Sequence, residues 1–219
     1  MVIISRLMLL HALLLLFLSS FLASSVQMVF AKGNKNGYVR EACSVTRYQE
    51  LCVHSLAQFS NTAGTSPSKW ARAGVSVTIG EVKKVRAYLA QLKRNGGFIG
   101  RNRAALSDCA EVFDDALDEL HRSLDVLRKL SKTTFSTQMG DLNTWISAAL
   151  TDENTCLDGF SFQVQDNNNN NNHNNNKKKQ IKLLQRRVQN VSYITSNALA
   201  LVNKLATTGI ESFVDQDKS

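Results

Sequence analysis

Apolar residues recur at alternating steps of three and four along four segments of the chain, the spacing that is typical of amphipathic helices. In the second segment these positions fall within an arc of about 80° at 100° per residue. The four segments run from Ser68 to Asn95, from Arg103 to Leu130, from Asp141 to Phe160 and from Gln180 to Ala206. The predicted core positions, segment by segment, are Ala71, Val75, Thr78, Val82, Val85, Leu89 and Leu92; Leu106, Cys109, Phe113, Ala116, Leu120, Leu124 and Leu127; Leu142, Trp145, Ala149, Cys156 and Phe160; and Ile181, Leu184, Val188, Val191, Ala198, Val202 and Leu205. Four such stripes predict an all-α fold, an up-and-down four-helix bundle.

A shorter unit precedes the four helices. Residues 38–60 are too short and too interrupted for one long helix, and they contain Cys43 and Cys52. A disulfide between these two would fold the stretch back as a small helical hairpin. Pro67, the single proline of the chain, suits the entry to the first long helix. We therefore expect a hairpin and loop over residues 38–66 and the bundle over residues 67–206.

The first 31 residues are typical of a secretory signal peptide. Arg6 precedes an apolar run from Leu7 to Leu22, and a cleavage site fits near Ala31, with residues 24–25 as the alternative. The run of about 16 residues is shorter than the roughly 20 that cross a bilayer, so we expect no stable membrane anchor. The mature domain is expected to span residues 32–219 and to be exported.

Export gives the four cysteines a structural meaning, because an oxidising compartment favours disulfides. Of the three possible pairings, Cys43 with Cys52 and Cys109 with Cys156 is the simplest. In the loop-entropy model these bonds contribute about 2.7 and about 4 kcal/mol. No C-x2-C pair or histidine cluster has the spacing of zinc ligands, so we expect neither a metal nor another cofactor.

Basic residues outnumber acidic ones, 26 to 18, giving a net charge of +8 that favours contact with something anionic. The asparagine- and lysine-rich tract of residues 166–179 predicts a solvated loop over residues 163–179. Its lysines form a basic cluster with Lys182, Arg186 and Arg187, which suits weak association with an anionic polysaccharide or serves only for solubility. The secretory leader argues against nucleic acid. Asn190 begins the one standard N-glycosylation motif.

No arrangement of residues indicates a catalytic centre. His54, His121 and His173 stand in different settings, none beside a candidate nucleophile, and each is expected at the surface. Asp114 and Asp115 are adjacent, so on a helix they point in different directions and cannot form an acid/base couple. Every cysteine is assigned to a disulfide, which leaves no thiol for nucleophilic work. The sequence predicts a protein that is not an enzyme.

The outward sides of the second and third helices carry the candidate binding surface. Acidic residues lie opposite the core stripe of the second helix, and a row of short hydroxyls ending in an acid follows the third. A plain solvated face is the alternative interpretation. An acidic face on a basic protein would nevertheless steer it towards a basic partner surface. The two outward rows are Glu111, Asp115, Asp118 and Arg122, and Thr144, Ser147, Thr151, Thr155 and Asp158.

At these residues the sequence resembles the plant inhibitors of pectin methylesterase and invertase. The resemblance lies in CSVTRYQELC (43–52), ALSDCAEVFDDALDEL (105–120) and TWISAALTDENTCLDGF (144–160). It implies a four-helix bundle with an N-terminal helical hairpin, one disulfide within the hairpin and one between the second and third bundle helices. It also implies a 1:1 inhibitor that covers the enzyme's substrate cleft. The contacts it implies are at Glu111, Asp115, Asp118, Thr155 and Asp158.

The sequence departs from the family pattern at several points. Gln49 stands where many members have proline, and the asparagine tract replaces the more usual loop before the last helix. The Pro-Lys-Phe element associated with invertase inhibitors is absent, which favours pectin methylesterase over acid invertase as the target. A cell-wall pectin-binding module and a domain once fused to an esterase are further alternatives, and the chain's end about ten residues past the last helix argues against the latter. We expect a secreted protein of the plant cell wall (apoplast).

Overall fold

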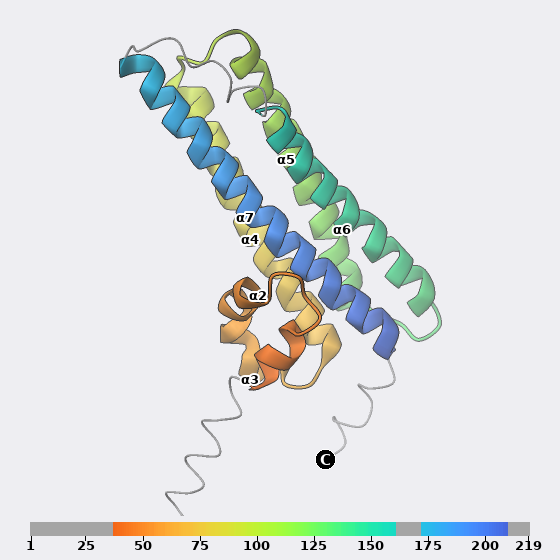
Figure 1. Ribbon diagram of the computed structural model, residues 1–219. Coiled ribbons are helices and arrows are strands. Elements are labelled where there is room, and N and C mark those ends of the chain that lie inside the picture. Colours follow the sequence, from red (N-terminus) through yellow and green to blue (C-terminus); the bar gives the residue numbers. More distant parts are fainter. Residues whose placement is uncertain (1–36, 161–171, 210–219) are drawn as a thin grey trace, which may run out of the picture.

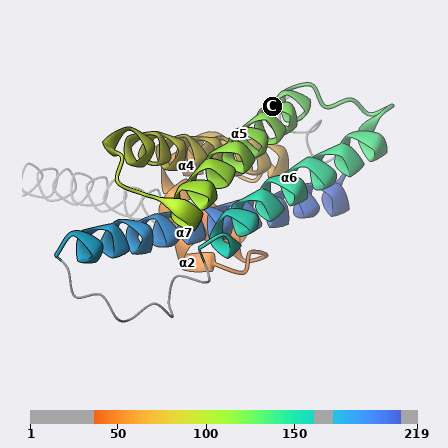
Figure 2. The same ribbon diagram turned by 90° about the horizontal axis from the view of Figure 1, so that it is seen from above.

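Four long helices form an antiparallel bundle in the computed structural model, which describes residues 37–160 and 172–209 (Figure 1). The helices are α4 (Pro67–Asn95), α5 (Gly100–Arg128), α6 (Phe135–Asp158) and α7 (Asn172–Thr208). Helix α4 packs against α5 and α7, and α6 packs against the same two neighbours, so the four helices form a closed ring; Figure 2 shows α4 beside α5 and α6 beside α7. The predicted all-α fold class and four-helix bundle are confirmed. The predicted signal peptide lies outside the described residues.

The ends of α4 follow from local sequence. The Ser66 hydroxyl accepts a hydrogen bond from the backbone N–H of Lys69, and Pro67 occupies the first helical turn, where its missing N–H costs nothing. The helix stops at Gly96, whose φ of +64° is a conformation that glycine adopts without strain. The predicted start and end of this helix therefore agree with the structure to within one residue.

Two helices begin six or more residues earlier than their apolar stripes predict. Helix α6 begins at Phe135 instead of Asp141, and α7 begins at Asn172 instead of Gln180. The predicted loop over residues 163–179 is therefore wrong from residue 172 onwards, and its residues 163–171 lie outside the described part. Lysine is a good helix former and needs no core contact, so the lysine run continues α7 beyond its apolar stripe.

The predicted core positions are buried with one exception on α6. Trp145 is only half-buried, and its neighbour Ile146 is fully buried in its place. Trp145 stands at the edge of the apolar stripe and therefore stays partly exposed. Glu153, a charged residue type that the stripe did not include, is also fully buried on α6.

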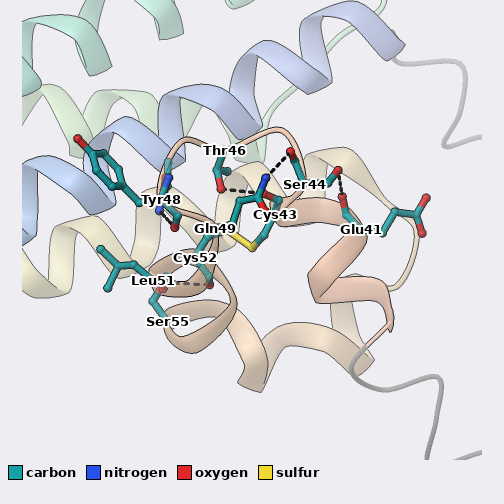
Figure 3. The surroundings of a disulfide bond; sticks show 10 residues. Glu41, Cys43, Ser44, Thr46, Tyr48, Gln49, Leu51, Cys52 and Ser55 are labelled. Carbon is teal, nitrogen blue, oxygen red and sulfur yellow. Dashed lines mark hydrogen bonds between the residues drawn. A yellow bond between two sulfur atoms is a disulfide. The ribbon is translucent and has the colours of Figure 1, made fainter.

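The N-terminal unit is a helical hairpin held by the Cys43–Cys52 disulfide (Figure 3). It consists of a helical turn over residues 37–43, α2 (Gln49–Leu56), η1 (Ala57–Phe59) and α3 (Ser60–Ala63). The Gln49 side chain, at the position where proline was expected from the resemblance, donates to the carbonyl oxygen of Ser44 at 3.1 Å. This hydrogen bond ties the turn between the two cysteines.

The hairpin packs mainly on α4 and α7, at one end of the bundle (Figure 1). The Asn197 side chain on α7 exchanges two hydrogen bonds with the backbone of Tyr48, at 3.1 and 2.9 Å. The rings of Tyr48 and Tyr193 stack with centroids 4.0 Å apart. Trp70 of α4 is buried in the small core beneath the hairpin. The hairpin is thus fixed to one side of the bundle and leaves the opposite side, between α5 and α6, largely uncovered.

Candidate functional site

The uncovered side carries the two rows of polar residues that the sequence predicts as a binding surface. We call it the α5–α6 face and define it by Glu111, Asp115 and Asp118 on α5 and Thr155 and Asp158 on α6, all of which are exposed. The predicted surface position of all five residues agrees with the structure. Their role in binding a partner remains a prediction.

The second disulfide, Cys109–Cys156, fixes how the two helices face one another. Both cysteines are buried, and their Cα atoms are 4.5 Å apart. Because α5 and α6 run antiparallel, a step forward from Cys109 on α5 corresponds to a step back from Cys156 on α6. Glu111 and Thr155, which lie within two residues of the two cysteines, therefore stand at the same level of the bundle. The disulfide thus holds the two halves of the α5–α6 face in one register.

The adjacent acids Asp114 and Asp115 point to different neighbours. Asp114 forms an ion pair with Arg86 of α4. Asp115 lies on the other side, where its charge acts on Asp152 of α6 and on Glu119. Only Asp115 therefore contributes its charge to the α5–α6 face, in agreement with the prediction that this pair is not an acid/base couple.

Two acids at the junction of α5 and α6 were missed by the sequence reasoning. Burial, together with the charges of Asp152 and Asp115, raises the pKa of Glu119 to about 7, and Arg122 opposes this rise. Burial and the charge of Asp115 also raise the pKa of Asp152. Glu119 follows Asp115 by four residues, so helical spacing alone could have placed it in this group. The middle of the face is thus a cluster of mutually repelling carboxylates.

The threonines of α6 use their hydroxyl hydrogens within the helix. Thr144, Thr151 and Thr155 each donate to the carbonyl oxygen four residues earlier, at 2.9 Å. Their hydroxyl oxygens can still accept hydrogen bonds from outside. The five residues of the α5–α6 face therefore offer acceptors, the carboxylate and hydroxyl oxygens. Such a face is complementary to a surface that supplies donors such as lysine, arginine or backbone N–H groups.

The other predicted chemical groups lie elsewhere. His54 and His121 are exposed, and the side chain of His173 is outside the described part. Among residues 37–160 and 172–209, no group of three or more His, Cys, Asp or Glu could hold a metal ion. No helix within the same ranges is long and apolar enough to span a membrane. Asn190 is exposed on α7, and its glycosylation remains a prediction.

The fold and this face together define a helical bundle that is tied by two disulfides and has an acidic outer face on α5 and α6. The chain belongs to the plant invertase/pectin methylesterase inhibitor family, whose model matches residues 37–201. This family is one of inhibitors, and the protein is accordingly not an enzyme. The resemblance predicted from the three sequence stretches is confirmed.

Individual relatives support the assignment. The chain is 44% identical over 174 residues to "Pectinesterase inhibitor 6" of Arabidopsis thaliana, covering 79% of this chain and 77% of the relative. It is 32% identical to the "21 kDa protein" of Daucus carota, over 78% and 84% of the two chains. The crystal structure of a mutant form of a pectin methylesterase inhibitor from Arabidopsis matches with a TM-score of 0.53 at 18% identity, over 74% of this chain and 92% of that one. At that identity the structural match supports the fold alone.

Proposed function

We propose that the protein inhibits pectin methylesterase by covering the enzyme's substrate cleft with the α5–α6 face in a 1:1 complex. The 44% identity to a protein named a pectinesterase inhibitor carries the choice of target. The choice of face is supported by the hairpin, which occupies the α4–α7 side and leaves the α5–α6 side largely uncovered. Inhibition would be competitive, since a bound bundle excludes the methylated polysaccharide and no bond is made or broken.

The α5–α6 face is preorganised, which favours binding to an enzyme. The Cys109–Cys156 disulfide fixes the two helices, and the threonine hydroxyls are held by their own helix. Short side chains lose little conformational entropy when a partner covers them. Binding energy is therefore not lost to ordering the inhibitor, and a few residues at the centre of the contact should account for most of it.

The double variant Asp115→Lys with Thr155→Trp tests the proposed face. It reverses one charge and places a large ring where a small hydroxyl stood, and we expect it to abolish inhibition of pectin methylesterase. The matched control is Glu50→Lys with Thr207→Trp, which makes the same charge reversal and the same Thr→Trp change at exposed positions of the hairpin and of the end of α7. The control should inhibit like the parent protein. Circular dichroism checks that both variants keep the helical content of the parent.

Unchanged inhibition by the face variant would refute the proposed docking surface. The same assay run against an acid invertase separates the two possible targets: inhibition of invertase alone would refute the choice of pectin methylesterase. The absence of a Pro-Lys-Phe element supports the esterase.

Secretion to the cell wall is part of the proposal. N-terminal sequencing of the protein recovered from the extracellular fluid should find a start after Ala31 or in the region of residues 24–25. A glycan on Asn190 would lie on α7 beside α4, because Asn190 lines a hollow with Glu81 and Arg186. Glycosylation there is compatible with docking through the α5–α6 face.

A further inference from the structure

A basic groove runs along the junction of α4 and α5, next to the α5–α6 face but separate from it. The hollow has a volume of about 540 Å³, and its walls carry Lys83, Arg86, Lys93 and Arg94. Ala87, Ala90 and Ala110 also line it. We call this hollow the basic groove. Asp114, paired with Arg86, is its one acidic lining residue.

The cations of the basic groove are largely available. Lys83, Lys93 and Arg94 are exposed, and none of the ion pairs within the described residues involves them. Because Lys83 lies well away from Lys93 and Arg94 along α4, one small anion cannot contact all three cations, whereas a chain of repeated anions can. The groove therefore has the electrostatic character of a polyanion site.

The shape of the groove favours an extended polymer. Lys83 and Arg94 lie 11 residues apart on one side of α4, which corresponds to about 16 Å along the helix. The alanine methyl groups of the lining suit the C–H faces of sugar rings, and the lining cations suit carboxylates repeated along a chain. Arg103 lies seven residues before Ala110 on α5, so it extends the same stripe towards the end of the bundle.

The basic cluster of α7 is a weaker candidate. Its Arg186 and Arg187 line a hollow with Lys84 between α4 and α7. There, Lys84 is paired with Glu81 at 2.6 Å, and the Arg187 guanidinium lies 4.4 Å from the ring centroid of Tyr88. Two of the three cations in that hollow already have a partner within the protein, which favours the basic groove as the site.

We propose that the basic groove binds a linear polymer of uronic acid, namely de-esterified homogalacturonan, the carboxylate product of pectin methylesterase. The choice of this polyanion over nucleic acid rests on the proposed function, which places the protein with pectin outside the cell. Helix α5 turns Ala110 and Asp114 towards the groove and Asp115 towards α6, so the groove and the α5–α6 face are occupied independently. The groove would retain the inhibitor where demethylation has already taken place.

Retention of the intact mature protein on immobilised polygalacturonate tests the proposal. Binding should fall as sodium chloride is raised, because salt screens exposed charges. Fully methyl-esterified pectin, the same polymer without its charges, should not retain the protein. The variant Lys83→Gln, Lys93→Gln, Arg94→Gln should bind polygalacturonate about tenfold more weakly, as expected for three exposed ion pairs.

Two further variants serve as comparisons. Lys69→Gln, Arg72→Gln, Lys129→Gln removes the same net charge at exposed positions elsewhere and should bind within about twofold of the parent. Equal loss of retention in this variant and in the groove variant would show that net charge alone acts, and it would overturn the proposal.

The variant Lys179→Gln, Lys182→Gln, Arg186→Gln tests whether the basic cluster of α7 binds the polymer instead. The proposal would also be overturned if the α7 variant lost its retention on polygalacturonate while the groove variant kept it. Equal retention of the parent protein on methyl-esterified pectin would overturn it as well.

Failure of this inference can be distinguished from failure of the proposed function. The groove variant should still inhibit pectin methylesterase on a soluble methylated substrate, because its three residues lie outside the α5–α6 face. The variant Asp115→Lys with Thr155→Trp should lose inhibition and keep its retention on polygalacturonate. If the groove variant keeps both its inhibition of pectin methylesterase and its full retention on polygalacturonate, the proposed polymer site is refuted and the proposed inhibition is not.

Discussion

The hydroxyl oxygen of Thr195 on α7 lies 2.7 Å from Oε1 of Glu153 on α6, inside the bundle core. The same hydroxyl lies 3.0 Å from the carbonyl oxygen of Val191. A hydroxyl carries one hydrogen and cannot donate to both oxygens at once. A protonated Glu153 resolves this conflict, because it donates to Thr195 while Thr195 donates to Val191.

The environment of Glu153 favours this neutral form. Burial raises the pKa of Glu153 to about 8, and the charge of Asp152 acts in the same direction, while the nearby hydroxyls of Thr195 and Ser192 favour the charged form and oppose the rise. The second carboxyl oxygen, Oε2, is buried without a hydrogen-bond partner, which is more costly for a charged group than for a neutral one. The folded protein therefore holds Glu153 protonated at acidic and neutral pH.

Protein stability should fall as pH rises because of Glu153. Its pKa is higher in the folded protein than the ordinary value of 4.5, so the folded state binds the extra proton. The stabilisation is fully present below pH 4.5 and is lost as pH rises through about 8. The slope from this group is at most about 1.4 kcal/mol per pH unit. Urea unfolding between these pH values measures it, and Glu153→Gln should flatten the curve. Equal slopes in the variant and the parent would contradict the assignment.

Glu119 should have a weaker effect of the same sign. Its pKa is raised by burial and by repulsion from Asp152 and Asp115, so ionisation at alkaline pH destabilises the folded protein. Glu119→Gln should raise the free energy of unfolding at pH 8 by a few tenths of a kcal/mol, since water screens much of the repulsion. At pH 4.5 the difference should vanish. Urea unfolding of the variant and the parent at both pH values measures this difference.

The sequence predicted what depends on periodicity and missed what depends on contacts between helices. The stripes of α4, α5 and α7 are buried as expected, because an amphipathic helix can bury only its apolar side. Glu153 was not expected in the core, because its partner Thr195 is 42 residues away and no local pattern links the two. The coupling of Glu119 to Asp152 likewise depends on how α5 and α6 face one another.

The apolar pattern reports only what is buried, so it predicts neither where a helix ends in solvent nor what an exposed face binds. The start of α7 at Asn172 was missed because the stripe stops where the core stops, whereas the helix continues into solvent. The five residues of the α5–α6 face were placed at the surface correctly by the helical wheel. Their partner cannot be predicted from the wheel, since a solvated face and a binding face have the same pattern.

The two disulfides should differ in what their removal destabilises. Replacing Cys109 and Cys156 by alanine opens the longer loop and should lower the free energy of global unfolding by about 4 kcal/mol. Replacing Cys43 and Cys52 should cost at most about 2.7 kcal/mol, and mainly within the hairpin, which packs on the outside of α4 and α7. Hydrogen exchange should then accelerate in residues 49–56 and not in the centre of α5. Equal acceleration in both segments would show that hairpin and bundle unfold together.

Two glycines of α4 should respond oppositely to the same substitution. At Gly74 an added Cβ would lie 3.1 Å from Leu201 Cδ1 and 3.3 Å from the Cα of Ala198, whereas at Gly80 nothing lies within 4 Å. Gly80→Ala should stabilise the protein by about 1 kcal/mol, because alanine is the better helix former. Gly74→Ala has the same helical gain, but the new methyl group presses on the backbone of α7, and overpacking costs about 1–3 kcal/mol. Urea unfolding should therefore find Gly74→Ala at least about 1 kcal/mol less stable than Gly80→Ala. Equal stability of the two variants would mean that α4 and α7 can move apart at this point without cost.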